Sequence, residues 1–267
     1  MPVPLARIRN VIVDMDGVLW RGPQVMSGVH AFFETVRARG IRFVLATNNA
    51  TKPARSYVER LANLGIAIRE EEVITSPQAT AAFLAEKAPK AHVFVIGEAG
   101  LIEALERAGL RVANDAPDTA THVVVGLDRG LSYAKLAEAC LLIRRGAAFI
   151  GTNPDLTFPS ERGLTPGNGA ILAALQAATG VAPLVIGKPE PEMFRQALRR
   201  LNGTPEDTAV IGDRLDTDIL GGKRMQLTTL LVLSGVTTES DLAQSAIQPD
   251  YVFAHIGAVA EALRGIT

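Results

Sequence analysis

Four short apolar segments of this chain each lead directly into a cluster of polar residues. Residues 11–13, 43–46, 184–186 and 209–211 precede, in that order, Asp14-Met15-Asp16-Gly17, Thr47-Asn48-Asn49, Lys188, and Gly212-Asp213 with Asp218. Short apolar runs of this kind are typical of buried strands in parallel sheets. Open α/β sheets bind their ligands at the carboxyl ends of their strands. The four junctions therefore predict an α/β protein in which the polar clusters meet at one edge of a sheet.

Segments with helical spacing alternate with the apolar runs, which favours βαβ units. The segment 29–39 ends at Gly40 and the segment 54–64 at Gly65, both suited to close a helix. From about residue 79 to 180 the alternation continues without acidic residues at the strand ends. We therefore expect a discontinuous core domain, formed by 1–78 and 181–267, with a large α/β domain of residues 79–180 inserted into it.

Composition narrows the class of protein. The 267 residues are 48% hydrophobic, which is ample for a large core. A formal net charge of −1 and the absence of a long basic run argue against nucleic acid or an anionic membrane as partner. No apolar stretch reaches the ~18 residues that a membrane span needs. A single cysteine, Cys140, excludes an intrachain disulfide, and without a recognisable signal segment this favours the cytoplasm.

The paired carboxylates Asp14 and Asp16 have a simpler explanation, because Asp-x-Asp-Gly is also common in turns. The three other clusters favour a reactive site over that alternative. Carboxylates, a lysine and a hydroxyl in one pocket suit a phosphate monoester. A carboxylate attacks the phosphate dianion only where positive charge neutralises the repulsion.

Each cluster then has a chemical role. Asp14 is the expected nucleophile, since a carboxylate is already ionised at neutral pH and needs no activating base. Asp16 is expected to protonate the leaving oxygen as general acid and then to deprotonate the attacking water as base. Thr47 offers a hydroxyl, and the backbone amides of Asn48 and Asn49 can face phosphate oxygens. Lys188 supplies positive charge. Without the other clusters, the simpler interpretation would be a lysine exposed on the surface at a strand end.

The predicted cofactor is Mg²⁺, because the candidate ligands are all oxygens and Mg²⁺ retains waters and a substrate phosphate in its shell. The expected ligands are Asp14, the backbone carbonyl of Asp16, and Asp213. Asp218 follows Asp213 by five residues and is expected to bind the metal directly or through a water molecule.

These motifs, in this order, resemble those of the haloacid dehalogenase (HAD) superfamily of phosphohydrolases. The large insertion and the runs Asp14-Met15-Asp16-Gly17-Val18-Leu19-Trp20-Arg21-Gly22 and Thr47-Asn48-Asn49-Ala50-Thr51 resemble subfamily IIA, the NagD-like or 4-nitrophenylphosphatase group with a C2-type cap. The resemblance spans essentially the whole chain. It implies a Rossmann-like core and a Mg²⁺-dependent phosphatase that acts through an aspartyl-phosphate on a small phosphorylated metabolite.

The resemblance also suggests contacts in the inserted domain. Asn153 and Asp155 lie in a segment that resembles a cap loop near the active site of relatives. They are expected either to contact substrate, together with Thr47, Asn48, Asn49 and Lys188, or to close the hinge between the domains. Family members act on nucleotides, sugar phosphates, phosphoglycolate, glycerol phosphate or pyridoxal phosphate. Some form homodimers through the cap, which makes a homodimer the expected assembly by analogy.

Four alternatives remain at this point. A phosphotransferase or phosphomutase would use the same aspartyl-phosphate, and only its products distinguish it from a hydrolase. A non-catalytic phosphometabolite-binding protein would be expected to lack one of the four motifs. A dehalogenase does not need the second acid, Asp16, and a receiver domain lacks an insertion of ~100 residues.

Overall fold

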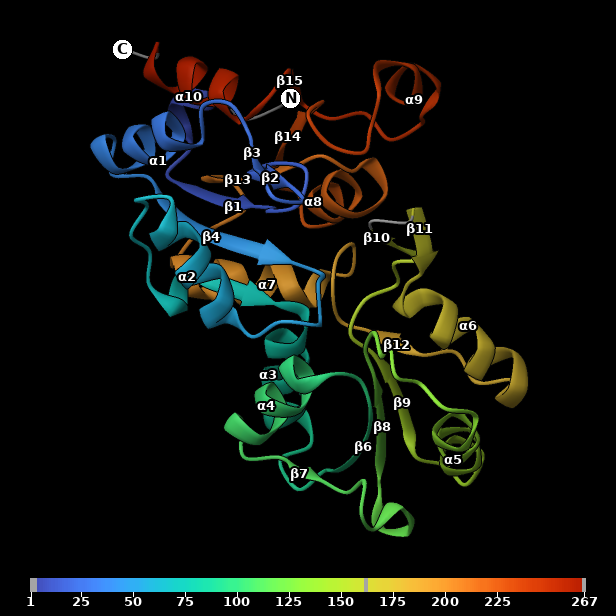
Figure 1. The fold of residues 1–267 in the computed structure, drawn as a ribbon. Coiled ribbons are helices and arrows are strands. Elements are labelled where there is room, and N and C mark those ends of the chain that lie inside the picture. The colour runs from blue at the N-terminus through green and yellow to red at the C-terminus, as the bar shows by residue number, and fades with distance from the viewer. Residues whose placement is uncertain (1–3, 161–162, 266–267) are drawn as a thin grey trace. The chain divides into compact units, whose positions relative to one another are not determined.

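The computed structural model describes residues 4–160 and 163–265 (Figure 1). The chain divides into two compact units. Unit 1 comprises the described residues within 1–47, 57–74 and 188–267, and unit 2 those within 48–56 and 75–187. Each unit contains a parallel sheet, which confirms the predicted α/β class with a Rossmann-like core and an inserted α/β domain.

The sheet of unit 1 has six strands in the order β15-β14-β13-β1-β4-β5. β1 pairs in parallel with both β13 and β4, so it occupies the middle of the sheet. All of its residues are buried, as expected for a central strand covered on both faces. The strands are β1 Asn10–Val13, β4 Arg42–Thr47, β5 Val73–Thr75, β13 Thr208–Gly212, β14 Thr228–Val232 and β15 Tyr251–Phe253.

Helices cover this sheet, with α1 packed against α10, and α7 against β1 and β4. The helices are α1 Val29–Ala38, α7 Pro191–Leu201, α8 Leu220–Arg224, α9 Glu239–Gln244 and α10 Ile256–Arg264, and α2 Ala54–Asn63 contributes residues to both units. Two short features follow strands of the sheet. A hairpin of β2 Trp20–Arg21 and β3 Gln24–Val25 comes after β1, and a π-helical turn, Leu215–Ile219, comes after β13.

The sheet of unit 2 has five parallel strands in the order β12-β9-β8-β6-β7. Apolar residues of β6, β8 and β9 pack with those of α5 and α6 to form its core. The strands are β6 His92–Ile96, β7 Arg111–Val112, β8 His122–Val125, β9 Ala148–Gly151 and β12 Leu184–Val185, with a separate hairpin of β10 Thr157–Ser160 and β11 Gly163–Pro166. The helices are α3 Ser76–Lys87, α4 Ala99–Arg107, α5 Tyr133–Arg144 and α6 Asn168–Thr179.

One predicted strand belongs to the other sheet. Residues 184–186 were expected beside the strands that carry the acidic clusters, but β12 pairs with β9, with Leu184 opposite Ile150. A short apolar run does not specify which sheet it joins, so the sequence could not decide this. The units also differ from the predicted domain limits (1–78, 79–180 and 181–267), because 48–56, 75–78 and 181–187 all lie in unit 2. The domain limits themselves stay a prediction, which limited proteolysis would test.

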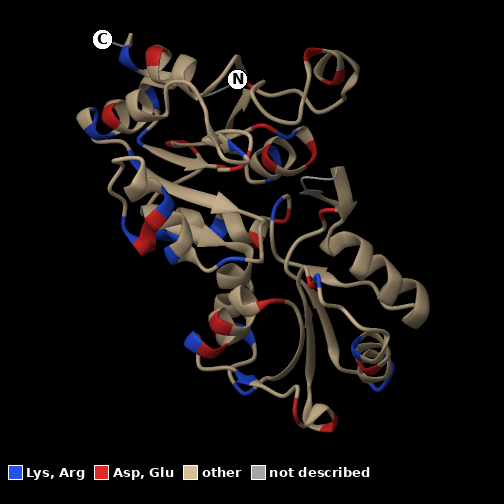
Figure 2. Ribbon diagram, viewed as in Figure 1, with Lys and Arg blue, Asp and Glu red and all other residues tan. Residues whose placement is uncertain are grey.

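Charged residues of both signs are interspersed along helices such as α2, α4 and α5 (Figure 2). This distribution agrees with the net charge of −1. Within residues 4–160 and 163–265, no helix combines the length and the apolarity that crossing a membrane requires.

Candidate active site

Asp14 lies at the carboxyl end of β1, in the middle of the unit 1 sheet. Its backbone N–H donates a 2.8 Å hydrogen bond to the carbonyl of Ile211 in β13, which extends the pairing of the two strands by one residue. Gly212 and Asp213 follow Ile211 directly. Parallel pairing of β1 and β13 therefore brings the first and the last polar clusters of the sequence to the same edge of the sheet.

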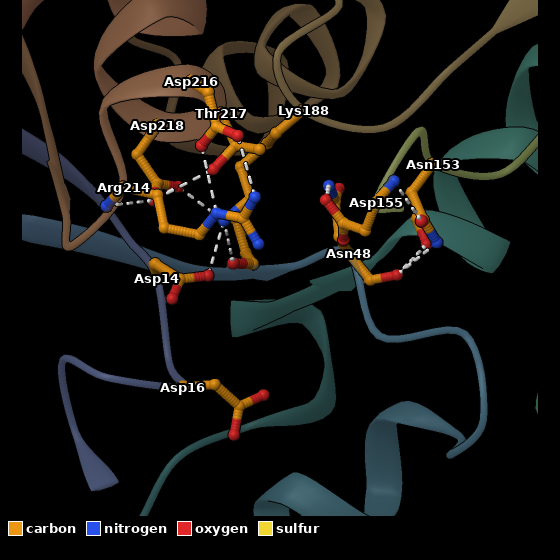
Figure 3. A network of polar contacts seen from close by, with 12 residues as sticks. Asp14, Asp16, Asn48, Asn153, Asp155, Lys188, Arg214, Asp216, Thr217 and Asp218 are labelled. Carbon is orange, nitrogen blue, oxygen red and sulfur yellow. Dashed lines mark hydrogen bonds and ion pairs between the residues drawn. The ribbon is translucent and has the colours of Figure 1, made fainter. Parts of the chain in front are cut away.

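Lys188 connects the cluster of Asp14 with that of Asp218 and also contacts β4 next to Thr47 (Figure 3). Its Nζ donates to Oδ1 of Asp14 at 2.5 Å, to Oδ1 of Asp218 at 2.7 Å and to the carbonyl of Ala46 at 3.1 Å. Ala46 precedes Thr47 at the end of β4. The lysine is only 3% exposed, so these contacts replace the hydration of its ammonium group. The surface-lysine alternative is therefore wrong, and burial of the charge depends on its carboxylate partners.

Three buried carboxylates surround this site. Ligand atoms of Asp14, Asp213 and Asp218 all lie within 4.8 Å of one another. One lysine charge against three carboxylate charges leaves two negative charges uncompensated in a buried volume. Such an imbalance is costly in a low-dielectric interior, where charges are stable only when they are paired or bound to a metal.

The carboxylate pKa values express this excess of negative charge. Burial raises the pKa of Asp14 well above its usual value, and Asp218 and Asp213 add to the shift while Lys188 opposes it. Burial, and then the charge of Asp218, raise the pKa of Asp213 to about 7. For Lys188, burial alone would lower the pKa, but the charges of Asp14 and Asp218 and hydrogen bonds to them raise it overall. The lysine therefore stays charged, and its one positive charge faces three carboxylates.

The cluster fits a divalent cation by its donor atoms and by its charge. All three candidate ligands offer carboxylate oxygens, which Mg²⁺ prefers over nitrogen or sulfur. Two oxygens on opposite sides of a Mg²⁺ ion lie about 4 Å apart. The 4.8 Å limit within the cluster is close to that span, and two positive charges would balance the two uncompensated negative charges. The cluster could therefore hold a metal ion.

Two local features fix the carboxylates that follow β13. The π-helical turn carries Asp218 back towards the sheet, where its Oδ2 accepts from the backbone N–H of Arg214 at 3.3 Å and from Thr217 Oγ1 at 3.4 Å. Single π-helical turns are frequent at functional sites. Beside Asp213, Gly17 has a φ of +87°, and a Cβ there would lie 2.3 Å from Asp213 Oδ2. Only glycine fits both the backbone conformation and this close approach.

Asp16 differs from Asp14 in its surroundings. Its side chain is exposed, and its Oδ1 accepts a 2.9 Å hydrogen bond from Nε1 of Trp20. Among the described residues its carboxylate is not part of the buried group of three. An exposed, oriented carboxylate suits proton exchange with a substrate or water. Its backbone carbonyl as a metal ligand stays a prediction.

Sequence reasoning missed the aromatic group beside Asp16. Trp20 is fully buried, and its ring stacks nearly parallel to that of Tyr57, with centroids 6.4 Å apart. The guanidinium carbon of Arg60 lies 4.0 Å from the centroid of the Trp20 ring. Burial and then the charge of Asp16 raise the pKa of Tyr57, so its hydroxyl stays protonated. Trp20 could have been suspected, because it follows the Asp-x-Asp-Gly motif by only a few residues. Nothing in the sequence indicated Tyr57 or Arg60.

The other predicted substrate contacts divide into two groups. Thr47 ends β4 in unit 1 and is buried. In unit 2, Asn48 donates to Oδ1 of Asp155 at 3.4 Å, and its backbone carbonyl accepts from Nδ2 of Asn153 at 2.8 Å. The structure thus brings Asn48, Asn153 and Asp155 together, although they are far apart in sequence (Figure 3).

Asn49 has a local role in the turn that follows β4. Its Oδ1 accepts from the backbone N–H of Thr51 at 3.0 Å and from the Thr51 hydroxyl at 2.7 Å. Such hydrogen bonds between a side chain and the nearby backbone make asparagine common in turns. Contact of the Asn49 side chain with substrate stays a prediction.

The two parallel sheets define an α/β protein, and the buried lysine and three carboxylates near the carboxyl ends of β1 and β13 give it a candidate site for a metal ion and a phosphoryl group. The haloacid dehalogenase-like hydrolase family matches residues 11–111, and a second HAD-hydrolase-like family matches residues 185–259. An acid sugar phosphatase of Staphylococcus aureus is 41% identical over 258 residues, 96% of this chain and 99% of that protein. The chain belongs to the haloacid dehalogenase-like hydrolase family.

Solved structures agree with this assignment. A 4-nitrophenylphosphatase from Thermotoga maritima superposes with a TM-score of 0.93 at 35% identity, covering 97% of this chain and 98% of that one. NagD from E. coli K-12 gives a TM-score of 0.87 at 33% identity, covering 94% and 97%. Both similarities lie within the predicted NagD-like, 4-nitrophenylphosphatase-like subfamily IIA, which is thereby confirmed.

Proposed function

We propose that this protein is a Mg²⁺-dependent phosphatase that hydrolyses small phosphomonoesters through an aspartyl-phosphate. The observation that carries the proposal is the buried Lys188 ammonium held between Asp14 and Asp218, with Asp213 in the same cluster. A site that brings one nucleophilic carboxylate next to fixed positive charge meets the main requirement for attack on a phosphate dianion. The family assignment and the names of the relatives support the same activity.

In the first half of the reaction, an oxygen of Asp14 attacks phosphorus as the bond from phosphorus to the leaving oxygen breaks. Asp16 gives its proton to the departing oxygen, so the alcohol leaves uncharged. Lys188 balances negative charge at Asp14 and at the phosphoryl oxygens, since positioning and electrostatics supply most of the catalysis in phosphoryl transfer. Bound Mg²⁺ would add positive charge next to the phosphoryl group and help to orient it.

In the second half, Asp16 is a carboxylate and removes a proton from a water molecule. The water oxygen attacks phosphorus, the bond to Asp14 breaks, and phosphate leaves. Asp14 returns as a carboxylate and Asp16 as an acid, so the cycle is balanced. Asp14, Asp213 and Asp218 would hold the metal with the backbone carbonyl of Asp16, and Asp218 acts directly or through a water molecule.

The remaining residues are proposed to bind the substrate. The Thr47 hydroxyl and the backbone amides of Asn48 and Asn49 contact phosphoryl oxygens, as backbone N–H groups do at many phosphate sites. Asn153 and Asp155 contact the organic part of the substrate. The supporting observation is that Asn48, Asn153 and Asp155 are hydrogen-bonded into one polar group.

Sugar phosphates are the substrate class that we favour. The support is the 41% identity, over nearly the full length of both chains, to a protein named as an acid sugar phosphatase. The decisive experiment is phosphate release from a panel of sugar phosphates, nucleotides, glycerol phosphate, phosphoglycolate, pyridoxal phosphate and 4-nitrophenyl phosphate, each with Mg²⁺ and with EDTA. Magnesium-dependent release is the expected result, and no release from any compound would contradict the proposal.

Two broader predictions belong with this function. The first is a cytoplasmic location, which fractionation of the source cells would test. The second is a homodimer formed through the inserted domain. Analytical ultracentrifugation would detect it, and a monomer at micromolar concentration would contradict it.

A further inference from the structure

Arg21 links the hairpin of β2 and β3, which follows the loop that carries Asp14 and Asp16, to the segment that follows β14. Its side chain donates from one terminal nitrogen to the carbonyl of Ser234 at 2.8 Å and to that of Gly235 at 2.7 Å. Ser234 adds a second tie, because its hydroxyl donates to the carbonyl of Gly17 at 2.8 Å. Residues 234–237, which we call the brace segment, are thus bound to Gly17 in the loop between β1 and β2 and to Arg21 in β2.

The brace segment directly contacts the candidate metal ligand Asp213. The backbone N–H of Val236 donates to Oδ2 of Asp213 at 2.7 Å, and that of Thr237 donates to its backbone carbonyl at 3.1 Å. Gly235 approaches so closely that a Cβ there would lie 1.8 Å from the same Oδ2. One oxygen of Asp213 is therefore held by the brace segment, which fixes the orientation of the carboxylate.

We infer that Arg21 is a positioning residue for the metal centre: it fixes the brace segment against Asp213 and thereby sets the affinity of the site for a divalent cation. The inference rests on the proposed metal site. Groups that hydrogen-bond to a metal ligand reduce the ordering that must accompany metal binding. Arg21 is exposed and would coordinate nothing itself, so its effect on the metal is transmitted through the backbone of residues 234–236.

The expected loss of Mg²⁺ affinity depends on how many hydrogen bonds separate Arg21 from the metal ligand Asp213. Loss of a group that bonds a metal ligand directly costs 10- to 100-fold in affinity. Arg21 bonds the brace segment, which in turn bonds the ligand, so removal of Arg21 is expected to weaken Mg²⁺ binding by roughly three- to tenfold. The remaining tie from Ser234 to Gly17 keeps the loss below the full value.

Arg21→Met tests the inference, because methionine keeps much of the side-chain length without its donors. Arg200→Met is the matched control. Arg200 also lies in unit 1 and donates to two backbone carbonyls, those of Glu71 at 3.2 Å and Val73 at 2.6 Å, but neither belongs to the acidic cluster. Isothermal titration of each metal-free protein with MgCl₂, well below its unfolding temperature, measures affinity without relying on turnover. The fluorescence of Trp20, the single tryptophan and the neighbour of Arg21, gives a second readout.

Weaker Mg²⁺ binding by Arg21→Met, with unchanged binding by Arg200→Met, is the expected result. Equal affinity in wild type and Arg21→Met would overturn the inference while leaving the metal site intact. Equal losses in both variants would also overturn it, because they would show a general effect of losing backbone ties. No Mg²⁺ binding by the wild type would overturn the metal site as well. If Arg21→Met does not fold, Arg21→Lys, which retains one donor group, is expected to show a smaller loss in the same titration.

Discussion

The indole Nε1 of Trp20 donates a 2.9 Å hydrogen bond to Oδ1 of Asp16. Trp20 is itself held in place, since it is fully buried and its ring contacts both the Tyr57 ring and the guanidinium of Arg60. A rigid donor thus orients an exposed carboxylate. In the proposed reaction that carboxyl group must reach the leaving oxygen, and small errors in its position reduce proton transfer.

Trp20→Phe is therefore expected to slow the release of poor leaving groups. Phenylalanine keeps an aromatic ring against Tyr57 and Arg60 but lacks the N–H. We expect single-turnover cleavage of an alkyl phosphate to fall by roughly tenfold, and that of 4-nitrophenyl phosphate to fall much less, because nitrophenolate leaves without protonation. Rapid-quench assays of both substrates measure the difference.

The control for this prediction is a double-mutant cycle with Asp16→Asn. In the Asp16→Asn background no carboxylic acid remains to be positioned, so Trp20→Phe should add little further loss. Additive losses would instead indicate that Trp20 acts through the fold and not through Asp16.

Much of the acidic cluster could be predicted because the motifs lie at strand ends. Asp14 and Asp213 follow strands that pair directly, and the carboxyl ends of parallel neighbours share one edge of the sheet. Lys188 was correctly predicted to join the acidic cluster, but the strand that precedes it was placed in the wrong sheet. The strand before it lies in the other sheet, and the lysine reaches Asp14 and Asp218 after the chain has returned to unit 1.

The parts that escaped prediction depend on contacts between distant residues. The brace segment shows no motif, since its function lies in backbone N–H groups that any residue but proline supplies. Tyr57 and Arg60 are ordinary residues of an amphipathic helix until the fold places them beside Trp20. The turn formed by Asn49 could have been predicted, because asparagine side chains commonly accept a hydrogen bond from the backbone N–H two residues further along the chain.

Asp14→Asn is expected to abolish turnover, by roughly 10³-fold or more, because the amide is a poor nucleophile. The fold should remain, since the side chain keeps its shape and the buried cluster loses one of its excess negative charges. Acid quenching after incubation with ³²P-labelled substrate should trap a phosphorylated protein for the wild type and none for the variant. Retained turnover in Asp14→Asn would rule out the covalent route.

Lys188→Met is expected to destabilise the metal-free protein. It removes the cation from a buried pair and leaves Asp14 and Asp218 facing each other without a counter-charge. Breaking a buried ion pair in this way costs about 3–5 kcal/mol in the free energy of unfolding. Urea denaturation in EDTA measures the loss, and MgCl₂ should recover part of it by supplying positive charge to the same carboxylates.

Lys223→Met is the matched control for that measurement. Lys223 pairs with Asp250 at 2.5 Å in the same unit, but its side chain is 38% exposed. Exposed pairs contribute about 0–1 kcal/mol. A comparable loss of stability in the two variants would mean that the buried ion pairs of Lys188 contribute no more to the free energy of unfolding than an exposed pair does.

The pH dependence of stability at the acidic cluster should largely disappear when the metal is added. In EDTA, the raised pKa of Asp213, about 7 against 3.8 for the unperturbed group, means that the folded protein holds a proton that the unfolded chain has lost. Its contribution to stability is then fully present below about pH 4 and is lost as the pH rises through 7, and Asp14 acts in the same direction.

With saturating Mg²⁺ the cation displaces these protons, so neither the folded nor the unfolded protein binds a proton at these carboxylates between pH 5 and 8, and stability should change little over that interval. Urea unfolding at several values between pH 5 and 8 should therefore give a falling curve in EDTA and a nearly flat one in MgCl₂. Asp213→Asn is the control: an amide does not titrate, so the fall in EDTA should be smaller than in the wild type, with Asp14 supplying the remainder. Parallel curves with and without Mg²⁺ in the wild type would show that the cation does not bind at these carboxylates.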